Sequence, residues 1–160
     1  MRALKKADAG KGNGKASDAN IFPRIGIDIL VVRKGSFLVG QRTQEDGWAL
    51  PGGKLELNET IKEGALRELR EETGLAGVFE DVIHVTENRY YGPHFVNLLV
   101  LIRCERGAPK VLEPDCIGGW QWIPLDKIPK KMFLGQDKRL ASALSAKDKK
   151  IYHRYSSLWK

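Results

Sequence analysis

The feature that most constrains this chain of 160 residues is a pattern of fixed spacing between residues 53 and 75. Five residues separate Gly53 from Glu59, and seven more precede the run Arg67-Glu68-Leu69-Arg70-Glu71-Glu72-Thr73-Gly74-Leu75. The pattern fixes seven residue identities, each with a usage of about 7%, and two further positions that any apolar residue can fill. A chance match is therefore on the order of 10⁻⁹ per start position. An ordinary solvated helix would explain any one of these glutamates, but it does not explain the whole stretch.

Local signals predict a helix of about four turns over residues 60–73. Thr60 and Glu63 form a capping-box pair, in which the glutamate side chain reaches back to the start of the helix. Apolar residues recur at helical spacing and make one stripe along it. Gly74 is suited to end the helix, because glycine readily takes the left-handed conformation.

Three carboxylates, Glu68, Glu71 and Glu72, stand at positions i, i+3 and i+4 and therefore share one helix face. Like charges at this spacing oppose one another by a few tenths of a kcal/mol per pair. A hard divalent cation would offset more of that repulsion. Mg²⁺ takes oxygen ligands in octahedral geometry and keeps several waters, so two or three carboxylates plus substrate phosphates suit it. The preceding residues 50–54 add glycines that let the backbone approach a phosphate closely, and the positive charge of Lys54.

The stretch resembles the Nudix box, written GX5EX7REUXEEXGU, and matches it at every fixed position. The resemblance extends over roughly residues 22–135. It implies an α+β fold, namely an α/β/α sandwich with a mixed central sheet and the catalytic helix after a glycine loop. It also implies hydrolysis of a nucleoside diphosphate linked to a further group, with Mg²⁺ as the cofactor and Mn²⁺ able to substitute for it.

The same resemblance implies roles for single residues. Arg67 is implied to be part of the catalytic machinery, where it orients a box glutamate, and Glu59 to brace the loop against the helix. The general base is left open between a box glutamate and one outside the box, for which Glu113 is a candidate. The implied catalytic and metal-binding groups are the backbone carbonyl of Gly53 and the carboxylates of Glu68, Glu71 and Glu72.

Substrate selection has to come from residues outside the box. The region of Trp120 and Glu113 is similar to that in which short MutT-type members build a nucleobase pocket. Tyr90 and Pro93 give conflicting hints, toward dinucleoside-polyphosphate and ADP-ribose hydrolases. His94 is left open between a general base, a donor that reads the nucleobase and a structural histidine. The candidate substrate-binding residues are Arg42, Gly52, Lys54, Tyr90, His94, Glu113 and Trp120.

These observations predict a Mg²⁺-dependent hydrolase that cleaves a pyrophosphate bond in a nucleoside di- or triphosphate and releases the nucleoside monophosphate. Hydrolysis of ADP-ribose, a nucleotide sugar or a dinucleoside polyphosphate is an alternative, as is action on RNA 5′ ends. A further alternative, from a different functional class, is a module that senses nucleotides or binds RNA without cleaving it. Such relatives usually lose box carboxylates, and this chain keeps all of them, which favours hydrolysis.

The net charge of +7 is unevenly distributed. Residues 1–20 carry +3 and residues 137–160 carry +5, which leaves −1 on the remainder. Because residues 1–20 contain almost no large apolar groups, we expect a flexible basic tail there, followed by one domain over residues 21–160 that includes a C-terminal helical segment. Basic ends could attract nucleic acid. Residues 1–20 contain no interleaved aromatic residues that would form a stacking surface, and a small-molecule nucleotide is the expected partner.

Hydrophobic patterns predict strands at residues 24–33, 36–42, 48–51, 78–89, 94–103 and 120–124, and a helix near 137–147 with a second helical piece after it. No apolar run approaches the ~20 residues of a transmembrane helix, and the two cysteines make no metal-binding motif. We therefore expect a cytoplasmic protein that does not contact membranes. A homodimer is left open.

Overall fold

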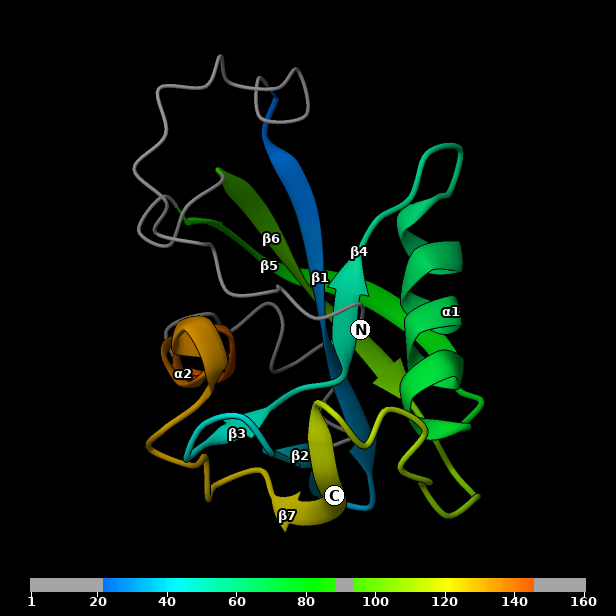
Figure 1. Cartoon of the computed structure of the whole chain (residues 1–160), viewed down its shortest axis with the longest axis vertical. Coiled ribbons are helices and arrows are strands. Elements are labelled where there is room, and N and C mark those ends of the chain that lie inside the picture. Colours follow the sequence, from blue (N-terminus) through cyan, green and yellow to red (C-terminus); the bar gives the residue numbers. More distant parts are fainter. Residues whose placement is uncertain (1–21, 89–93, 146–160) are drawn as a thin grey trace.

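The computed structural model of the chain describes residues 22–88 and 94–145. Figure 1 shows a twisted sheet with helix α1 (Ile61–Thr73) on one side and helix α2 (Gln136–Leu144) on the other. The remaining elements are β1 (Arg24–Arg33), β2 (Ser36–Arg42), β3 (Trp48–Ala49), β4 (Gly52–Lys54), β5 (Val78–Asn88), β6 (Phe95–Arg103), β7 (Ile117–Pro124) and the short 3₁₀ helix η2 (Phe133–Gly135). This mixed-sheet sandwich confirms the predicted α+β fold.

Strand β1 is the centre of the sheet. It pairs in parallel with β6 along nearly its whole length, from Arg24 opposite Phe95 to Val32 opposite Arg103. Its other edge is shared by two antiparallel partners, with β4 at its first half and β2 at its end. Strand β5 continues the sheet beyond β6, and β3 and β7 both pair with β2. The glycine strand β4 is therefore hydrogen-bonded directly to the middle of the fold.

Two apolar layers form because side chains alternate along a strand. The layer that packs under α1 includes Ile27, Ile29, Val31, Val100, Ala65 and Leu69. The layer that packs under α2 includes Leu30, Val32, Leu99, Leu101, Leu140 and Ala143. Each face of the sheet is thus covered by one helix, which explains why the central strands read as continuous apolar runs.

Helix α1 begins and ends as its sequence predicts. Thr60 accepts a hydrogen bond from the backbone N–H of Glu63, and the Glu63 side chain accepts one from the backbone N–H of Thr60. Gly74 ends the helix in the left-handed conformation, and its N–H donates to the carbonyl of Arg70. Both ends are therefore set by local chemistry, independently of the sheet.

Several element boundaries differ from the sequence-based expectation, among them the end of β3, which lies at Ala49 and not at residue 51. Residues 52–54, expected as a loop, form strand β4, because their backbone pairs with β1. Strand β7 begins at Ile117 and not at Trp120, since its pairing with β2 continues past a register shift near Arg42. Helix α2 ends at Leu144, three residues before the expected end. The expected tail over residues 1–20 and the second helical piece lie outside the described residues.

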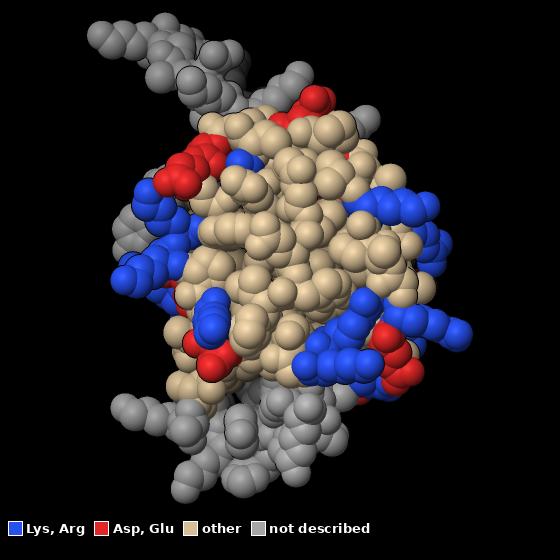
Figure 2. All heavy atoms as spheres, turned by 90° about the horizontal axis from the view of Figure 1, so that it is seen from below, with Lys and Arg blue, Asp and Glu red and all other residues tan. Residues whose placement is uncertain are grey.

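Charged side chains of the described residues do not form one continuous basic surface on the face drawn in Figure 2. Lys and Arg lie there in separate groups around a centre of uncharged residues. In the part of the chain that the structure describes, neither helix has the length and apolar character needed to cross a membrane.

The backbone of Gly52 generates the first testable prediction. Its φ is 151°, and a Cβ atom at this position would lie 2.0 Å from the carbonyl oxygen of Ile27. We expect Gly52→Ala to lower the free energy of unfolding by about 3 kcal/mol or more, because neither backbone can move without breaking the β1–β4 pairing. Urea unfolding measures this effect. The matched control is Gly119→Ala in β7, where nothing lies within 4 Å of the added atom; equal stability of the two variants would contradict the prediction.

Candidate active site

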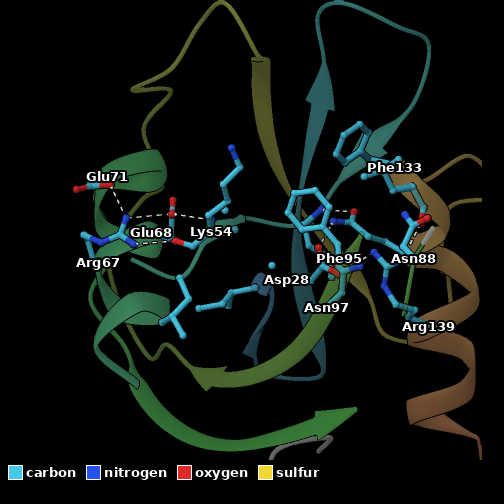
Figure 3. Close-up of a pocket in the computed structure, with 18 of the residues that line it drawn as sticks. Asp28, Lys54, Arg67, Glu68, Glu71, Asn88, Phe95, Asn97, Phe133 and Arg139 are labelled. Carbon is cyan, nitrogen blue, oxygen red and sulfur yellow. Dashed lines mark hydrogen bonds and ion pairs between the residues drawn. The ribbon is translucent and has the colours of Figure 1, made fainter. Parts of the chain in front are cut away.

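A cavity of about 610 Å³ opens where the second half of α1, strand β4 and the start of α2 approach one another. Figure 3 shows that its two ends differ in chemistry. One end is lined by charged side chains of α1 and β4, among them Glu68, Arg67 and Lys54. The other end carries aromatic and carboxamide side chains from β6, β5 and η2, among them Phe95 and Asn97. The volume lies within the range of sites for small molecules.

Backbone N–H groups of β4 hold two of the box glutamates at the charged end. The N–H of Gly52 donates to Glu72 Oε2 at 3.0 Å, and the N–H of Lys54 donates to Glu68 Oε1 at 3.2 Å. Glu68 is 5% exposed and Glu72 is 2% exposed. The helix therefore presents two buried carboxylates to the strand that precedes it, and each is positioned by the main chain.

Gly53 lies between the two residues that donate these hydrogen bonds. Because it has no side chain, the Glu68 carboxylate can approach the β4 backbone closely. A Cβ atom built at Gly53 would lie 2.2 Å from Glu68 Oε1. Any other residue would therefore displace the Glu68 carboxylate or push β4 away from the helix. The glycine brings backbone and carboxylate oxygens close together.

Arg67 connects the helix with the turn before it. Its Nε donates to Glu59 Oε1 at 2.6 Å, and its Nη2 donates to the backbone carbonyl of Lys54 at 3.1 Å. Its Nη1 lies 3.0 Å from Glu68 Oε1 and 3.1 Å from Glu71 Oε2. One guanidinium thus contacts three carboxylates, an arrangement consistent with the bracing role of Glu59 and the orienting role of Arg67 that the box resemblance implies.

Glu71 is placed differently from the other two box glutamates. Its side chain is 53% exposed and is turned toward Arg67, as Figure 3 shows. Within residues 22–88 and 94–145, no three His, Cys, Asp or Glu side chains converge closely enough to form a ready metal cluster. Glu68 and Glu72 are brought together by β4, whereas Glu71 would join them only by leaving its ion pair with Arg67.

The donor set at this end nevertheless fits a hard divalent cation. Burial raises the pKa of the Glu72 carboxyl to about 7, and the nearby Glu68 carboxylate acts in the same direction, against the Gly52 N–H. A buried acid beside a second acid is most easily ionised when a cation is present. Two carboxylates with space for substrate phosphates are what Mg²⁺ sites in proteins commonly provide.

Comparison with known proteins decides which family has this arrangement. The sequence model of the NUDIX domain family matches residues 22–144. The chain belongs to the NUDIX domain family. The predicted membership of the Nudix superfamily is thereby confirmed, and α1 can be called the Nudix helix.

Relatives and solved structures agree with this assignment. An RNA pyrophosphohydrolase of Xylella fastidiosa is 35% identical over 109 residues, which are 66% of this chain and 51% of that protein. A MutT-like protein of Streptomyces ambofaciens is 30% identical over 116 residues, 72% of this chain and 73% of the relative. The MutT NUDIX hydrolase from Burkholderia pseudomallei superimposes with a TM-score of 0.66 at 27% identity, covering 78% of this chain and 99% of that structure. The chain thus spans about half the length of the Xylella relative.

The structure brings only some of the predicted substrate-binding residues to this cavity. Gly52, Lys54 and Glu113 line it together with the Nudix helix. Glu113 comes from the loop before β7, where its carbonyl accepts from the backbone N–H groups of Cys116 and Ile117. Tyr90 lies outside the described residues.

Three other candidates lie away from the cavity. Arg42 lines a separate hollow, where its guanidinium stacks 3.9 Å from the ring centroid of Phe133. Trp120 packs in the apolar clusters around β2 and β7, and His94 lies with its Nε2 2.6 Å from a Glu87 carboxylate oxygen. The structure therefore does not bring Arg42, Trp120 or His94 to the cavity, and their roles in substrate binding stay predictions.

Several residues that line the cavity are not predicted from the sequence as site residues. Asp28 accepts hydrogen bonds from Gln136 Nε2 and Arg139 Nη2, both at 2.7 Å, and joins β1 to α2. Asn97 and Phe95 stand on β6 at the aromatic end. The sequence feature that could identify them is that Asp28 and Asn97 interrupt the apolar runs of β1 and β6. A polar residue in a strand that is buried on both faces of the sheet needs a hydrogen-bond partner or a function.

The Glu59–Arg67 contact generates a prediction about acid stability. The hydrogen bond from Arg67 lowers the pKa of Glu59 from 4.5 to about 2. A depressed carboxyl pKa contributes stability that is present above pH ~4.5 and is lost as the pH falls toward 2. We expect Glu59→Gln to flatten the dependence of the unfolding free energy on pH in this window, as measured by denaturant unfolding at a series of pH values. Glu56→Gln, in the same turn, is the control; an unchanged acid limb in Glu59→Gln would contradict the prediction.

Proposed function

We propose that this protein is a Mg²⁺-dependent pyrophosphohydrolase that cleaves an anhydride bond of a nucleoside di- or triphosphate and releases the nucleoside monophosphate. The observation that carries the proposal is that β4, which lines the cavity, holds two box glutamates through its backbone N–H groups. Glu68 itself lines the cavity, and Glu72 is buried. Membership of the NUDIX domain family and relatives named as pyrophosphohydrolase and MutT-like protein support the reaction class. The cytoplasmic location remains a prediction, and the homodimer remains open.

The proposed chemistry assigns a task to each group at the charged end. Glu68 and Glu72 would hold Mg²⁺, with the Gly53 carbonyl and Glu71 as the further ligands that the box implies. The cation, when bound, neutralises the charge that develops on the phosphates during hydrolysis. Lys54 extends into the cavity (Figure 3) and would hold a phosphate oxygen.

Proton transfer is the remaining task. A water molecule has to lose a proton as it attacks phosphorus, and a nearby carboxylate is the ordinary acceptor. Of the candidate bases, Glu68, Glu71 and Glu113 line this cavity, whereas the box glutamate Glu72 is buried and is not among the lining residues. Arg67 contributes by orientation, since its guanidinium is already engaged by Glu59, Glu68 and Glu71.

A second candidate substrate is the 5′ end of RNA. It is favoured by the name of the Xylella relatives, RNA pyrophosphohydrolase, although this chain spans about half the length of those proteins. ADP-ribose, nucleotide sugars and dinucleoside polyphosphates also contain the bond concerned. A purely nucleotide-sensing role is less well supported, because every box carboxylate is retained.

Replacement of a buried box carboxylate tests the proposed mechanism. We expect Glu72→Gln to lower kcat by at least about 100-fold. The variant should remain folded, because a glutamine oxygen can still accept the Gly52 N–H and a buried charge is removed. Steady-state kinetics together with thermal unfolding make this measurement. The control is Glu63→Gln at the start of the same helix, where glutamine also completes a capping box; near-normal turnover of folded Glu72→Gln would remove this glutamate from the mechanism.

A substrate panel tests the function itself. With Mg²⁺ we expect nucleoside di- or triphosphates to yield monophosphates, no turnover in EDTA, and recovery of turnover with Mn²⁺. Product identification should include ADP-ribose, a nucleotide sugar, a dinucleoside polyphosphate and a 5′-triphosphate RNA oligonucleotide. Preferred cleavage of the RNA would favour the second candidate, and the absence of cleavage across the panel would argue for a binding module.

A further inference from the structure

The face of the sheet that packs under α2 changes character toward the cavity. Leu99 and Leu101 of β6 belong to the apolar layer that contacts α2. Two residues before Leu99 on the same strand face stands Asn97, and two residues before that stands Phe95. On the neighbouring strand, Asp28 interrupts the apolar run of β1 in the same way. Both buried polar residues require an explanation, since buried polar groups are normally hydrogen-bonded.

The burial of Asp28 is accounted for by hydrogen bonds with other residues of the protein. Its two carboxylate oxygens accept from Gln136 and Arg139 of α2, and Gln136 Oε1 accepts from the backbone N–H of Leu50 at 2.9 Å. Arg139 also donates to the carbonyl of Leu134 at 2.7 Å. This network joins β1, α2 and the loop before β4, and so it holds the wall of the cavity in place.

Hydrogen bonds within the described residues do not account for the burial of the Asn97 amide nitrogen. Its side chain is 9% exposed and lines the cavity, and its amide nitrogen is buried without a hydrogen-bond partner among the described residues. The terminal torsion of a carboxamide is roughly two-fold, so a half turn can present either its N–H groups or its oxygen to the cavity. Room for that turn comes from Gly26 on β1, where a Cβ atom would lie 2.5 Å from Asn97 Oδ1.

Two aromatic rings border the same end of the cavity. Phe95 precedes Asn97 by two residues on β6, and Phe133 reaches the cavity from η2 (Figure 3). Both side chains are half-buried. Phe133 is held from outside by the Arg42 guanidinium, 3.9 Å from the ring centroid. A flat, partly apolar ligand with polar groups on its edge suits such a place, because aromatic faces stack on it and a carboxamide pairs with its edge.

We propose that this end of the cavity binds the nucleobase of the substrate, that Phe95 and Phe133 provide its stacking surface, and that Asn97 forms the hydrogen bond with its edge. The proposal rests on the pyrophosphohydrolase function put forward above and names the part of the substrate that this site recognises. Asparagine is suited to the task, because its adjacent donor and acceptor match the adjacent acceptor and donor on a base edge. Asn97 is therefore a specificity-determining residue, whereas the reacting phosphates lie with Glu68 and Glu72.

The test compares two substrates with the full-length protein. One is the natural nucleoside triphosphate that is cleaved best. The other is an indole nucleoside triphosphate, whose base keeps a stacking surface but lacks exocyclic groups. We expect Asn97→Leu to raise KM for the natural substrate about tenfold, to leave kcat within about twofold, and to leave KM for the indole substrate unchanged. Gln44→Leu is the matched control, because its amide contacts the Asp115 carbonyl outside the cavity.

A second variant protects the test against a folding defect. Gly26→Ala keeps the amide but places a methyl group where the Asn97 carboxamide lies, so it should produce the same selective rise in KM. Equal effects of Asn97→Leu on both substrates, or no effect on either, would overturn the assignment of Asn97. Wild-type protein that hydrolyses the two substrates equally well would also overturn it while leaving the pyrophosphohydrolase function intact. Failure to hydrolyse any nucleotide would instead count against that function.

Discussion

The contact on which the rest of this structure depends is the donation of backbone N–H groups from the glycine strand to two carboxylates of the Nudix helix. Gly52 bonds Glu72 and Lys54 bonds Glu68, while the same strand pairs with the centre of the sheet. The helix is thereby fixed to the sheet through the groups that the chemistry needs. Buried carboxylates are costly unless they are hydrogen-bonded, so these two N–H groups stabilise both the fold and the charged end of the cavity.

A single guanidinium completes this arrangement. Arg67 contacts Glu59 in the turn, the Lys54 carbonyl on β4, and two carboxylates of its own helix. Its positive charge offsets part of the repulsion that i, i+3 and i+4 glutamates impose on one another. The side chain is only 22% exposed, which strengthens its hydrogen bonds relative to those of a surface ion pair. Arg67 thus holds the carboxylates in place.

The opposite end of the cavity is built by contacts that no local pattern could predict. Arg139 and Asp28 are 111 residues apart in the chain and 2.7 Å apart in space. Asn97 becomes a candidate only because the strand order brings it beside Gly26 and into the cavity wall. Conversely, Arg42 is a candidate substrate-binding residue by sequence, but its side chain lies against Phe133 in another hollow. Side-chain direction in such a place depends on strand pairing and packing.

Features that depend on neighbours within a few residues can be predicted from the amino-acid sequence. The capping box at Thr60, the end of the helix at Gly74, the shared face of the box glutamates and the central strands all follow from short-range spacing. Tertiary structure alone decided that Glu68 and Glu72 converge while Glu71 turns outward to Arg67. It also decided that carboxamide and aromatic side chains line the opposite end of the cavity that Glu68 lines. The physical reason is that local signals reflect backbone geometry, whereas a site is made of side chains from distant segments, whose positions follow from how the sheet and both helices pack together.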